Sequence, residues 1–481
     1  MLRIFKLCGT LLSLLAAESF AVELTLLGDF PGGRLSSSGN GISADGSLIC
    51  GNGELTLDPG EANEETVGAA FVWTAESGLT LLPFPQDLVG RRRAVARSMS
   101  DDGALIVGEA RNFFNKDQPA LWTRQADGSY TIELLNPPAG SPFSANVSAN
   151  LDALAISGNG TVITGRGQTI PGEYEAWRWT RETGLVAIGN LSGGPIMKSG
   201  RTSYSSGEGL DRSGNHLIGL SWSGMNDDDR LVRQAFSYVG DTMTALGDLQ
   251  DPPLASQGYG ISKDGTTVVG QARDPDLGQI AFRKVGDAPM EALGQFPATS
   301  PLSIARAVNA DGSVVIGESN TDRDREAFLW RADSSSGITS LSDLVTIEGG
   351  YLETANAISD DGLIIVGTVI YPDENNQNER EAYRLKLDAP ILASPSLPTL
   401  ALTALDNEVL LTFSASSSTA TFTLEFSPDL AQGFTPMVSF QNDTRETLSV
   451  TYEGSSVSLS PVTESLPKGG HGFWRLRMTL P

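Results

Sequence analysis

The sequence predicts an all-β protein: a seven-bladed β-propeller closed by its N-terminal strand, followed by a small β-sandwich. Three observations support this prediction. A hairpin sequence with a glycine at its turn occurs seven times, and a motif of alanine plus a large apolar residue follows each hairpin. The first strand after residue 21 also resembles the last strand of the internal repeats. About four strands in each repeat of about 50 residues are typical of propeller blades.

The first element of each repeat is a β-hairpin around an Asp-Gly or similar turn, as in "GISADGSLIC" at 41–50 and "AVNADGSVVI" at 307–316. Glycine accepts the positive φ that a tight turn requires, and aspartate or asparagine suits the position before it. The β-branched run after the turn, as in "TVVG" at 267–270, predicts the second strand. The turn glycines are Gly46, Gly103, Gly160, Gly214, Gly265, Gly312 and Gly362.

The third and fourth strands follow each hairpin. Alanine and a large apolar residue, as in "EAFLW" at 326–330, predict a third strand with an aromatic, packed face. A fourth strand reads "MTALGDL" at 243–249. The seventh repeat lacks this strand, but "LTLLGDF" at 24–30 nearly matches it. We therefore expect the first strand of residues 22–387 to complete the last blade.

The repeats resemble the bacterial extracellular HAF-type repeat family. The likeness lies in "LGDFPGG" at 27–33, "AVNADGSVVIG" at 307–317 and "EAFLW" at 326–330, and it covers about residues 24–387. The resemblance implies an exported repeat protein and supplies no catalytic residues.

Residues 1–21 have the pattern of a secretory signal peptide. Arg3 and Lys6 precede an apolar run at 7–17, which is too short to span a bilayer. We expect a secreted protein, extracellular or periplasmic, without membrane insertion. Cys8 would leave with the signal peptide, so Cys50 could form no internal disulfide, and we interpret it as a core residue.

The C-terminal part has a different pattern. Residues 388–398 ("DAPILASPSLP") predict a proline-rich linker. Short alternating strands at 399–481 predict a sandwich module of fibronectin type III or immunoglobulin character.

Charge and composition restrict the function. The net charge of −25 disfavours nucleic acid and anionic membrane surfaces as partners. With two histidines in no ligand-spaced cluster and no "GxSxG" sequence, neither a zinc site nor a serine hydrolase is indicated. We expect no cofactor. The run Asp227, Asp228 and Asp229 lacks the spacing of an EF-hand calcium loop, which makes calcium a weak alternative.

Variable polar loops on one face of the propeller are the candidate binding surface. They include the cationic connector with Arg91, Arg92 and Arg93, the run Asp227–Asp229, and Trp222 as a stacking surface. We expect a monomeric, non-catalytic protein that binds extracellular polysaccharide or a surface protein, or serves as a surface scaffold. The alternative is a glycoside hydrolase or lyase with acidic residues in the propeller mouth.

Overall fold

The computed structural model describes two compact units, Met1–Pro390 and Ile391–Pro481. In the first unit it describes residues 22–387, except 33, 62–63, 87–91, 112–115, 144–149, 171–172, 192–203, 226–230, 251–252, 334–336 and 373–377. In the second it describes the backbone of seven strands. The predicted signal peptide and the predicted linker lie outside the described residues.

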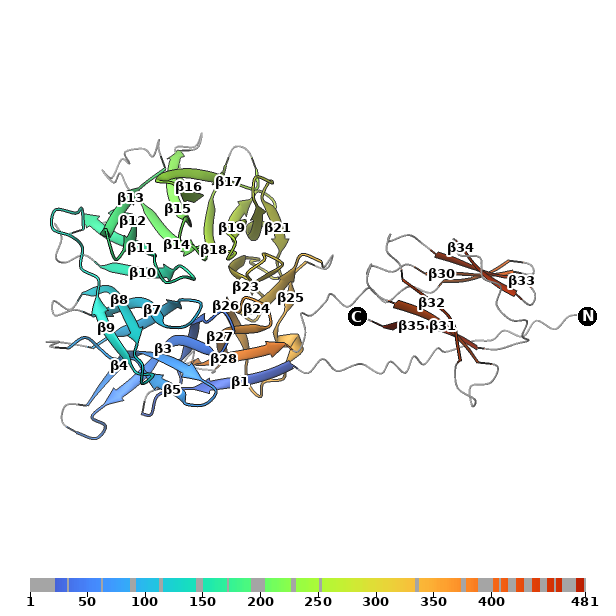
Figure 1. The fold of residues 1–481 in the computed structure, drawn as a ribbon, viewed down its shortest axis with the longest axis horizontal. Coiled ribbons are helices and arrows are strands. Elements are labelled where there is room, and N and C mark those ends of the chain that lie inside the picture. The colour runs from blue at the N-terminus through green and yellow to red at the C-terminus, as the bar shows by residue number, and fades with distance from the viewer. Residues whose placement is uncertain are drawn as a thin grey trace, which may run out of the picture. The chain divides into compact units, whose positions relative to one another are not determined.

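The first unit is a ring of seven antiparallel sheets, each with four strands (Figure 1). Blade 1 consists of β2 (Ser38–Ile42), β3 (Leu48–Leu57), β4 (Glu65–Thr74) and β5 (Gly78–Leu81). Blade 2 consists of β6 (Ala94–Met99), β7 (Leu105–Arg111), β8 (Asp117–Arg124) and β9 (Tyr130–Leu134). Blade 3 consists of β10 (Leu151–Ile156), β11 (Ile163–Ile170), β12 (Glu173–Thr180) and β13 (Gly184–Gly189). Blade 4 consists of β14 (Ser205–Leu210), β15 (His216–Met225), β16 (Leu231–Val239) and β17 (Thr242–Gly247). Blade 5 consists of β18 (Ser256–Ile261), β19 (Thr267–Asp274), β20 (Gly278–Val285) and β21 (Glu291–Gly294). Blade 6 consists of β22 (Ser303–Val308), β23 (Val314–Asn320), β24 (Arg325–Arg331) and β25 (Thr339–Ser340), and the 3-10 turn η1 (Ser342–Leu344) follows it.

Blade 7 closes the ring as predicted. Its inner strands are β26 (Tyr351–Ile358), β27 (Ile364–Tyr371) and β28 (Glu379–Leu387), and its outer strand is β1 (Val22–Gly28). β1 runs antiparallel to β28, with Leu24 opposite Leu385, and Figure 1 shows the blue β1 beside the orange β28. The prediction of seven blades closed by the N-terminal strand is confirmed.

The turn between the two inner strands has the same geometry in every blade. Its glycine has a positive φ, 77° at Gly312. A polar side chain three residues before the glycine accepts the N–H of the residue that begins the next strand, as Ser359 does from Ile364 at 2.9 Å. Ser359 also donates to Asp361 at 2.5 Å. The turn therefore needs a serine or similar residue as well as Asp-Gly.

Each innermost strand contains a β-bulge opposite a glycine of the second strand. In blade 6 the register shifts between Ala305 and Ala307, and a Cβ on Gly317 would lie 1.9 Å from the carbonyl oxygen of Ile304. The glycine that ends each "VVG" run is therefore required by this close approach.

The bulge leaves one unpaired residue per blade beside the central axis. We call these residues the axial ring: Asn40, Arg97, Leu154, Glu208, Tyr259, Arg306 and Asn356.

The core lies between neighbouring blades. Phe328 and Trp330 of blade 6 pack with Val269 and Ala281 of blade 5. Serines add polar links: Ser303 Oγ of blade 6 donates to the Gly294 carbonyl and accepts the Ala281 N–H of blade 5, at 2.7 and 2.8 Å. Equivalent links are made by Ser37, Ser205 and Ser256.

The second unit contains β29 (Ala401–Leu405), β30 (Glu408–Phe413), β31 (Thr421–Ser427), β32 (Thr435–Gln441), β33 (Leu448–Glu453), β34 (Ser456–Ser460) and β35 (Phe473–Thr479). They form one sheet in the order β29-β30-β33-β34 and another in the order β32-β31-β35. Packing of the two sheets as a sandwich stays a prediction. Among the residues described in both units, no helix is long and apolar enough to cross a membrane.

Candidate functional site

The candidate site lies at the end of the propeller axis where the innermost strands begin and the connectors between blades arrive. We call this the connector end. Of the residues predicted to bind a ligand, Arg92, Arg93 and Trp222 belong to the described part of the chain. Arg91 and Asp227–Asp229 lie outside the described residues.

Arg93 is paired with acidic side chains. Its Nη1 lies 2.9 Å from Asp117 Oδ2, and its Nη2 lies 3.5 Å from Glu109 Oε1. Arg92 is exposed. The charge of Arg93 is therefore compensated within its own blade, and ligand binding by the cationic connector stays a prediction.

Trp222 belongs to an aromatic group that spans blades 3 and 4. Its ring stacks on Tyr204, with centroids 5.6 Å apart and planes at 28°, and Tyr204 contacts Tyr174 at 6.0 Å. The guanidinium of Arg166 lies over the Tyr174 ring, 5.8 Å from its centroid. We call Tyr174, Tyr204 and Trp222 the aromatic row. Sequence reasoning identified Trp222 and missed the two tyrosines.

Comparison of the blades indicates that the fold does not require these aromatic residues. The position of Trp222, three residues after the second-strand glycine, is polar or charged in five of the other six blades, and in blade 7 it is the buried Ile370. The position of Tyr174, two residues before the third-strand alanine, holds no aromatic residue elsewhere. Its equivalents are Gly68, Gln118, Arg233, Gln279, Arg325 and Arg380.

Tyr204 has one aromatic counterpart. The equivalent residue by strand pairing in blade 7 is Tyr351, which is buried and covered by Arg323, 4.7 Å from its ring centroid. Blades 1, 2, 3, 5 and 6 have Ser36, Arg93, Asn150, Ala255 and Leu302. Aromatic residues at all three positions therefore occur together only where blades 3 and 4 meet.

In blades 2, 3 and 6, an arginine–carboxylate pair joins the innermost strand to the second strand. Arg97 binds Glu109 through two hydrogen bonds of 2.7 Å, and Arg306 binds Glu318 at 2.6 Å. Arg166 donates to Asp152 at 3.0 Å. Glu109 and Glu318 are buried, whereas the three arginine side chains remain 35 to 39% exposed. The arginines thus present partly accessible, already neutralised donors.

Glu208 of the axial ring differs from these carboxylates because no described arginine or lysine forms an ion pair with it. It accepts a hydrogen bond of 2.5 Å from Ser206. Burial raises the pKa of Glu208, although Ser206 and the charges of Arg166, Arg97 and Arg306 act in the opposite direction. The neighbouring Tyr259 has its pKa raised to about 12 by burial and by Glu208, while Arg306 lies 5.3 Å over its ring.

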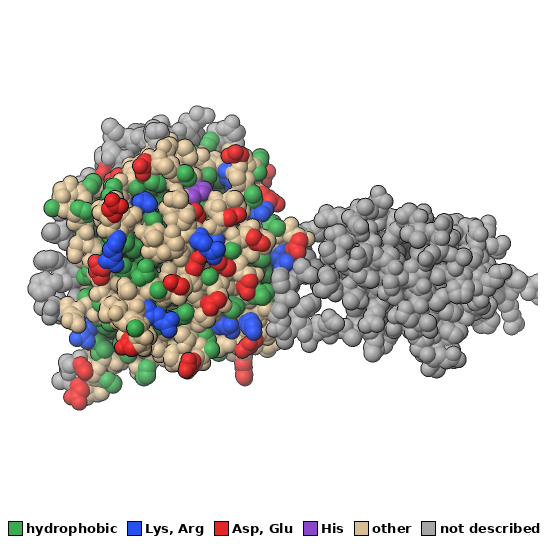
Figure 2. Space-filling model, in the orientation of Figure 1, with side chains coloured by type: hydrophobic (Ala, Val, Ile, Leu, Met, Phe, Trp, Pro, Cys, Tyr) green, Lys and Arg blue, Asp and Glu red, His purple; other side chains and the backbone are tan. Residues whose placement is uncertain are grey.

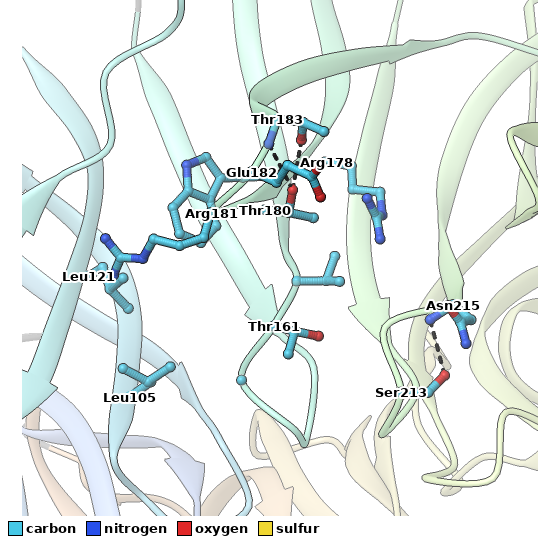
Figure 3. A pocket seen from close by; sticks show the side chains of 13 residues that line it. Leu105, Leu121, Thr161, Arg178, Thr180, Arg181, Glu182, Thr183, Ser213 and Asn215 are labelled. Carbon is cyan, nitrogen blue, oxygen red and sulfur yellow. Dashed lines mark hydrogen bonds between the residues drawn. The ribbon is translucent and has the colours of Figure 1, made fainter.

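A pocket of about 530 Å³ lies at the opposite end of the propeller, among blades 2 to 4 (Figure 3). Leu105 and Leu121 line one side and Ser213 and Asn215 the other, with the tip of blade 3 between them.

The described residues contain no group of three or more His, Cys, Asp or Glu side chains that could hold a metal ion. Figure 2 shows acidic and basic side chains intermixed on one face of the propeller, without a large area of one sign. That face therefore offers no extended electrostatic surface for a polyion.

A scan of protein-family models and a search of curated proteins find no match to the chain. The resemblance to HAF-type repeats therefore stays a prediction. Several solved structures resemble the chain at low sequence identity. TolB from Acinetobacter baumannii is 11% identical, over 71% of this chain and 81% of its own, with a TM-score of 0.36. The β-propeller domain of the Trilobed protease from Pyrococcus furiosus is 12% identical, over 64% and 84%, with a TM-score of 0.38. AofleA from Arthrobotrys oligospora is 12% identical, over 67% and 90%, with a TM-score of 0.36. At these scores the similarities carry no argument about ligand or activity, and the fold assignment rests on the strand pairing above.

Proposed function

We propose that the protein is an exported, non-catalytic binding protein that holds a neutral polysaccharide chain at the connector end of its propeller. The observation that carries this proposal is the aromatic row, which occupies positions at the connector end where most other blades have small or polar residues. The signal-peptide pattern at residues 1–21 and the HAF-type resemblance support export.

The chemistry of the row suits sugar rings. An aromatic face packs against the C–H face of a sugar, and neighbouring polar groups bind its hydroxyls. Arg166 and Asp152 supply a donor and an acceptor in a fixed pair beside Tyr174. Because the three arginine–carboxylate pairs are neutralised internally, hydroxyl groups match them better than charged groups do.

The second candidate is a glycoside hydrolase, and Glu208 is the observation that favours it. A carboxyl with a raised pKa is the property of a general acid. Hydrolysis also needs a second carboxylate about 5 to 10 Å from the acid. Asp152 is the candidate, since it lies on the innermost strand of blade 3, which contacts the innermost strand of blade 4 that carries Glu208.

One experiment separates the two functions and tests the row. The full chain is titrated, by tryptophan fluorescence and calorimetry, with malto-, cello-, xylo- and laminari-oligosaccharides from the disaccharide to the hexasaccharide. Reducing-sugar release is measured on the same samples. We expect binding without release. If the wild-type protein releases reducing sugar and the Glu208→Gln variant does not, the hydrolase is established. If the protein binds none of the oligosaccharide series, the glycan proposal is contradicted and a surface protein is left as the ligand.

A matched pair of variants locates the binding site. Trp222→Gln introduces the residue type of Gln168, which holds the equivalent position in blade 3. Arg273→Gln changes the equivalent exposed residue of blade 5. We expect Trp222→Gln to weaken binding about tenfold or more, and Arg273→Gln to leave binding unchanged. Equal behaviour of the two variants would place the ligand elsewhere.

A further inference from the structure

We infer that the propeller binds the end of a polysaccharide chain, with the terminal sugar at the axial ring beside Glu208. This inference rests on the proposed function. It specifies which part of the chain is recognised, and it can fail while glycan binding itself holds. Four features of the described residues lead to it.

The first feature is a closed ring of backbone hydrogen bonds at the end of the axis opposite the connector end. There the tight turn of each blade bonds to the turn of the next blade, with N···O distances of 2.9 to 3.2 Å. The N–H groups of Ala44, Asp101, Asn159, Arg212, Lys263, Ala310 and Asp360 donate, in that order, to the carbonyls of Asp101, Gly158, Arg212, Lys263, Ala310, Asp360 and Ala44. The circle returns to its starting residue, so the seven turns converge around the axis.

The second feature is a group of charged side chains at the same end. Asp101 of blade 2 binds Lys263 of blade 5 at 2.5 Å and Arg212 of blade 4 at 2.6 Å, and Arg212 also binds Asp360 of blade 7. These blades are not all neighbours in the ring, so their side chains meet across the axis. Together with the backbone circle they obstruct the axis, and a chain that enters at the connector end cannot pass through.

The third feature is the direction of the aromatic row. Trp222 stacks on Tyr204, Tyr204 contacts Tyr174, and Arg166 covers Tyr174. Arg166 in turn donates to Asp152 on the innermost strand of blade 3 at 3.0 Å, and Gly207, next to Glu208, lies against Thr164 on the strand that carries Arg166. The row therefore leads through Arg166 to the innermost strands of blades 3 and 4, and a sugar chain stacked along it has one end at Glu208.

The fourth feature is the chemistry at that inner position. Glu208 offers an acceptor, and its Ser206 bond occupies one carboxylate oxygen. Arg97 and Arg306 use Nε and Nη2 on their own glutamates and remain 39 and 35% exposed. A terminal sugar has more free hydroxyls than an internal one, and hydroxyls both donate to a carboxylate and accept from a guanidinium.

Calorimetric stoichiometry with the wild-type protein tests this inference directly. The malto-, cello-, xylo- or laminari-series that binds is titrated from the disaccharide to the hexasaccharide and then as its parent polysaccharide. End recognition predicts one protein per chain at every length. A number of bound proteins that rises with chain length would overturn the inference, while the proposed function would stand.

A matched pair of variants tests the position of the chain end. Glu208→Gln removes the carboxylate charge with little change of shape, and we expect binding of every chain length to weaken about tenfold or more. Glu291→Gln changes an exposed glutamate on the outer strand of blade 5 and is expected to bind as wild type does. If Glu208→Gln melts as wild type and binds unchanged, the chain end does not lie at Glu208.

Discussion

Two separate constraints act on an inner-turn glycine such as Gly312. The first is its positive φ, 77° at Gly312, which strains any residue that has a Cβ. The second is contact with the preceding blade, since a Cβ on Gly312 would lie 2.3 Å from Thr267 Oγ1. The sequence indicated the first constraint through the Asp-Gly pattern. It could not indicate the second, because Thr267 belongs to another repeat.

Gly312→Ala is therefore expected to destabilise the propeller by about 2 to 4 kcal/mol, from backbone strain and the inter-blade clash together. Gly128 has a φ of 86°, and a Cβ at this position would have no atom within 4 Å, so Gly128→Ala isolates the strain, at about 1 kcal/mol. Urea denaturation of both variants measures the difference. Equal losses would mean that the turn glycines do not mediate contact between blades.

His216 occupies a position that is apolar or threonine in the other blades. Its Nδ1 lies 3.0 Å from the Gly265 carbonyl and its Nε2 lies 2.8 Å from Ser237 Oγ. A carbonyl only accepts, so Nδ1–H donates to Gly265, and in a neutral ring Nε2 then accepts from the Ser237 hydroxyl. Burial lowers the pKa of His216, outweighing the Gly265 carbonyl and the charge of Asp211, which favour protonation.

This direction predicts a loss of stability in acid. The unfolded chain protonates near the ordinary histidine pKa of about 6.5, before the folded protein does, so the contribution of His216 declines as pH falls below that value. His216→Val introduces the residue found at Val162 and Val314. Unfolding free energies measured from about pH 7 to about pH 5 should fall more steeply for wild type than for the variant. Parallel curves would contradict the neutral, buried histidine.

At the scale of elements, the strand β1 decides whether the ring is closed. The match between "LTLLGDF" and "MTALGDL" was enough to predict its place, because the missing fourth strand of blade 7 had one candidate. The serine links were not predicted. Four blades have them, whereas blades 2 and 3 have Ala94 and Leu151 at that position, so the pattern is not repeated seven times.

Deletion of residues 22–28 is expected to expose the N–H and C=O groups of β28 along one edge of blade 7. An open ring with an unpaired edge should melt earlier and associate through that edge. Thermal unfolding and size-exclusion chromatography check both effects. A deleted protein that is monomeric and melts at the wild-type temperature would show that β1 does not hold the ring.

At the scale of the whole molecule, comparison of equivalent positions in the seven blades separates residues that the fold requires from residues that it does not. Residues that recur, such as the turn glycines and the third-strand alanines, are explained by folding. The residues of the aromatic row differ from those at the equivalent positions of most other blades. Glu208 also differs from the paired carboxylates, because it has no ion pair with a described arginine or lysine. Trp222 could be selected from the sequence because tryptophan is conspicuous in a polar loop region. Tyr174 and Tyr204 could not, because only the meeting of blades 3 and 4 places them beside it.

The most direct test of the binding surface replaces the row by the residues of other blades. The triple variant Tyr174→Gln, Tyr204→Asn and Trp222→Gln introduces the residue types of Gln118, Asn150 and Gln168 at equivalent positions. Its affinity for the oligosaccharide that binds wild type is measured by calorimetry, together with its melting temperature. We predict a variant that stays folded and loses binding by more than tenfold. A folded variant that binds the oligosaccharide as tightly as wild type would contradict the aromatic row as the ligand site.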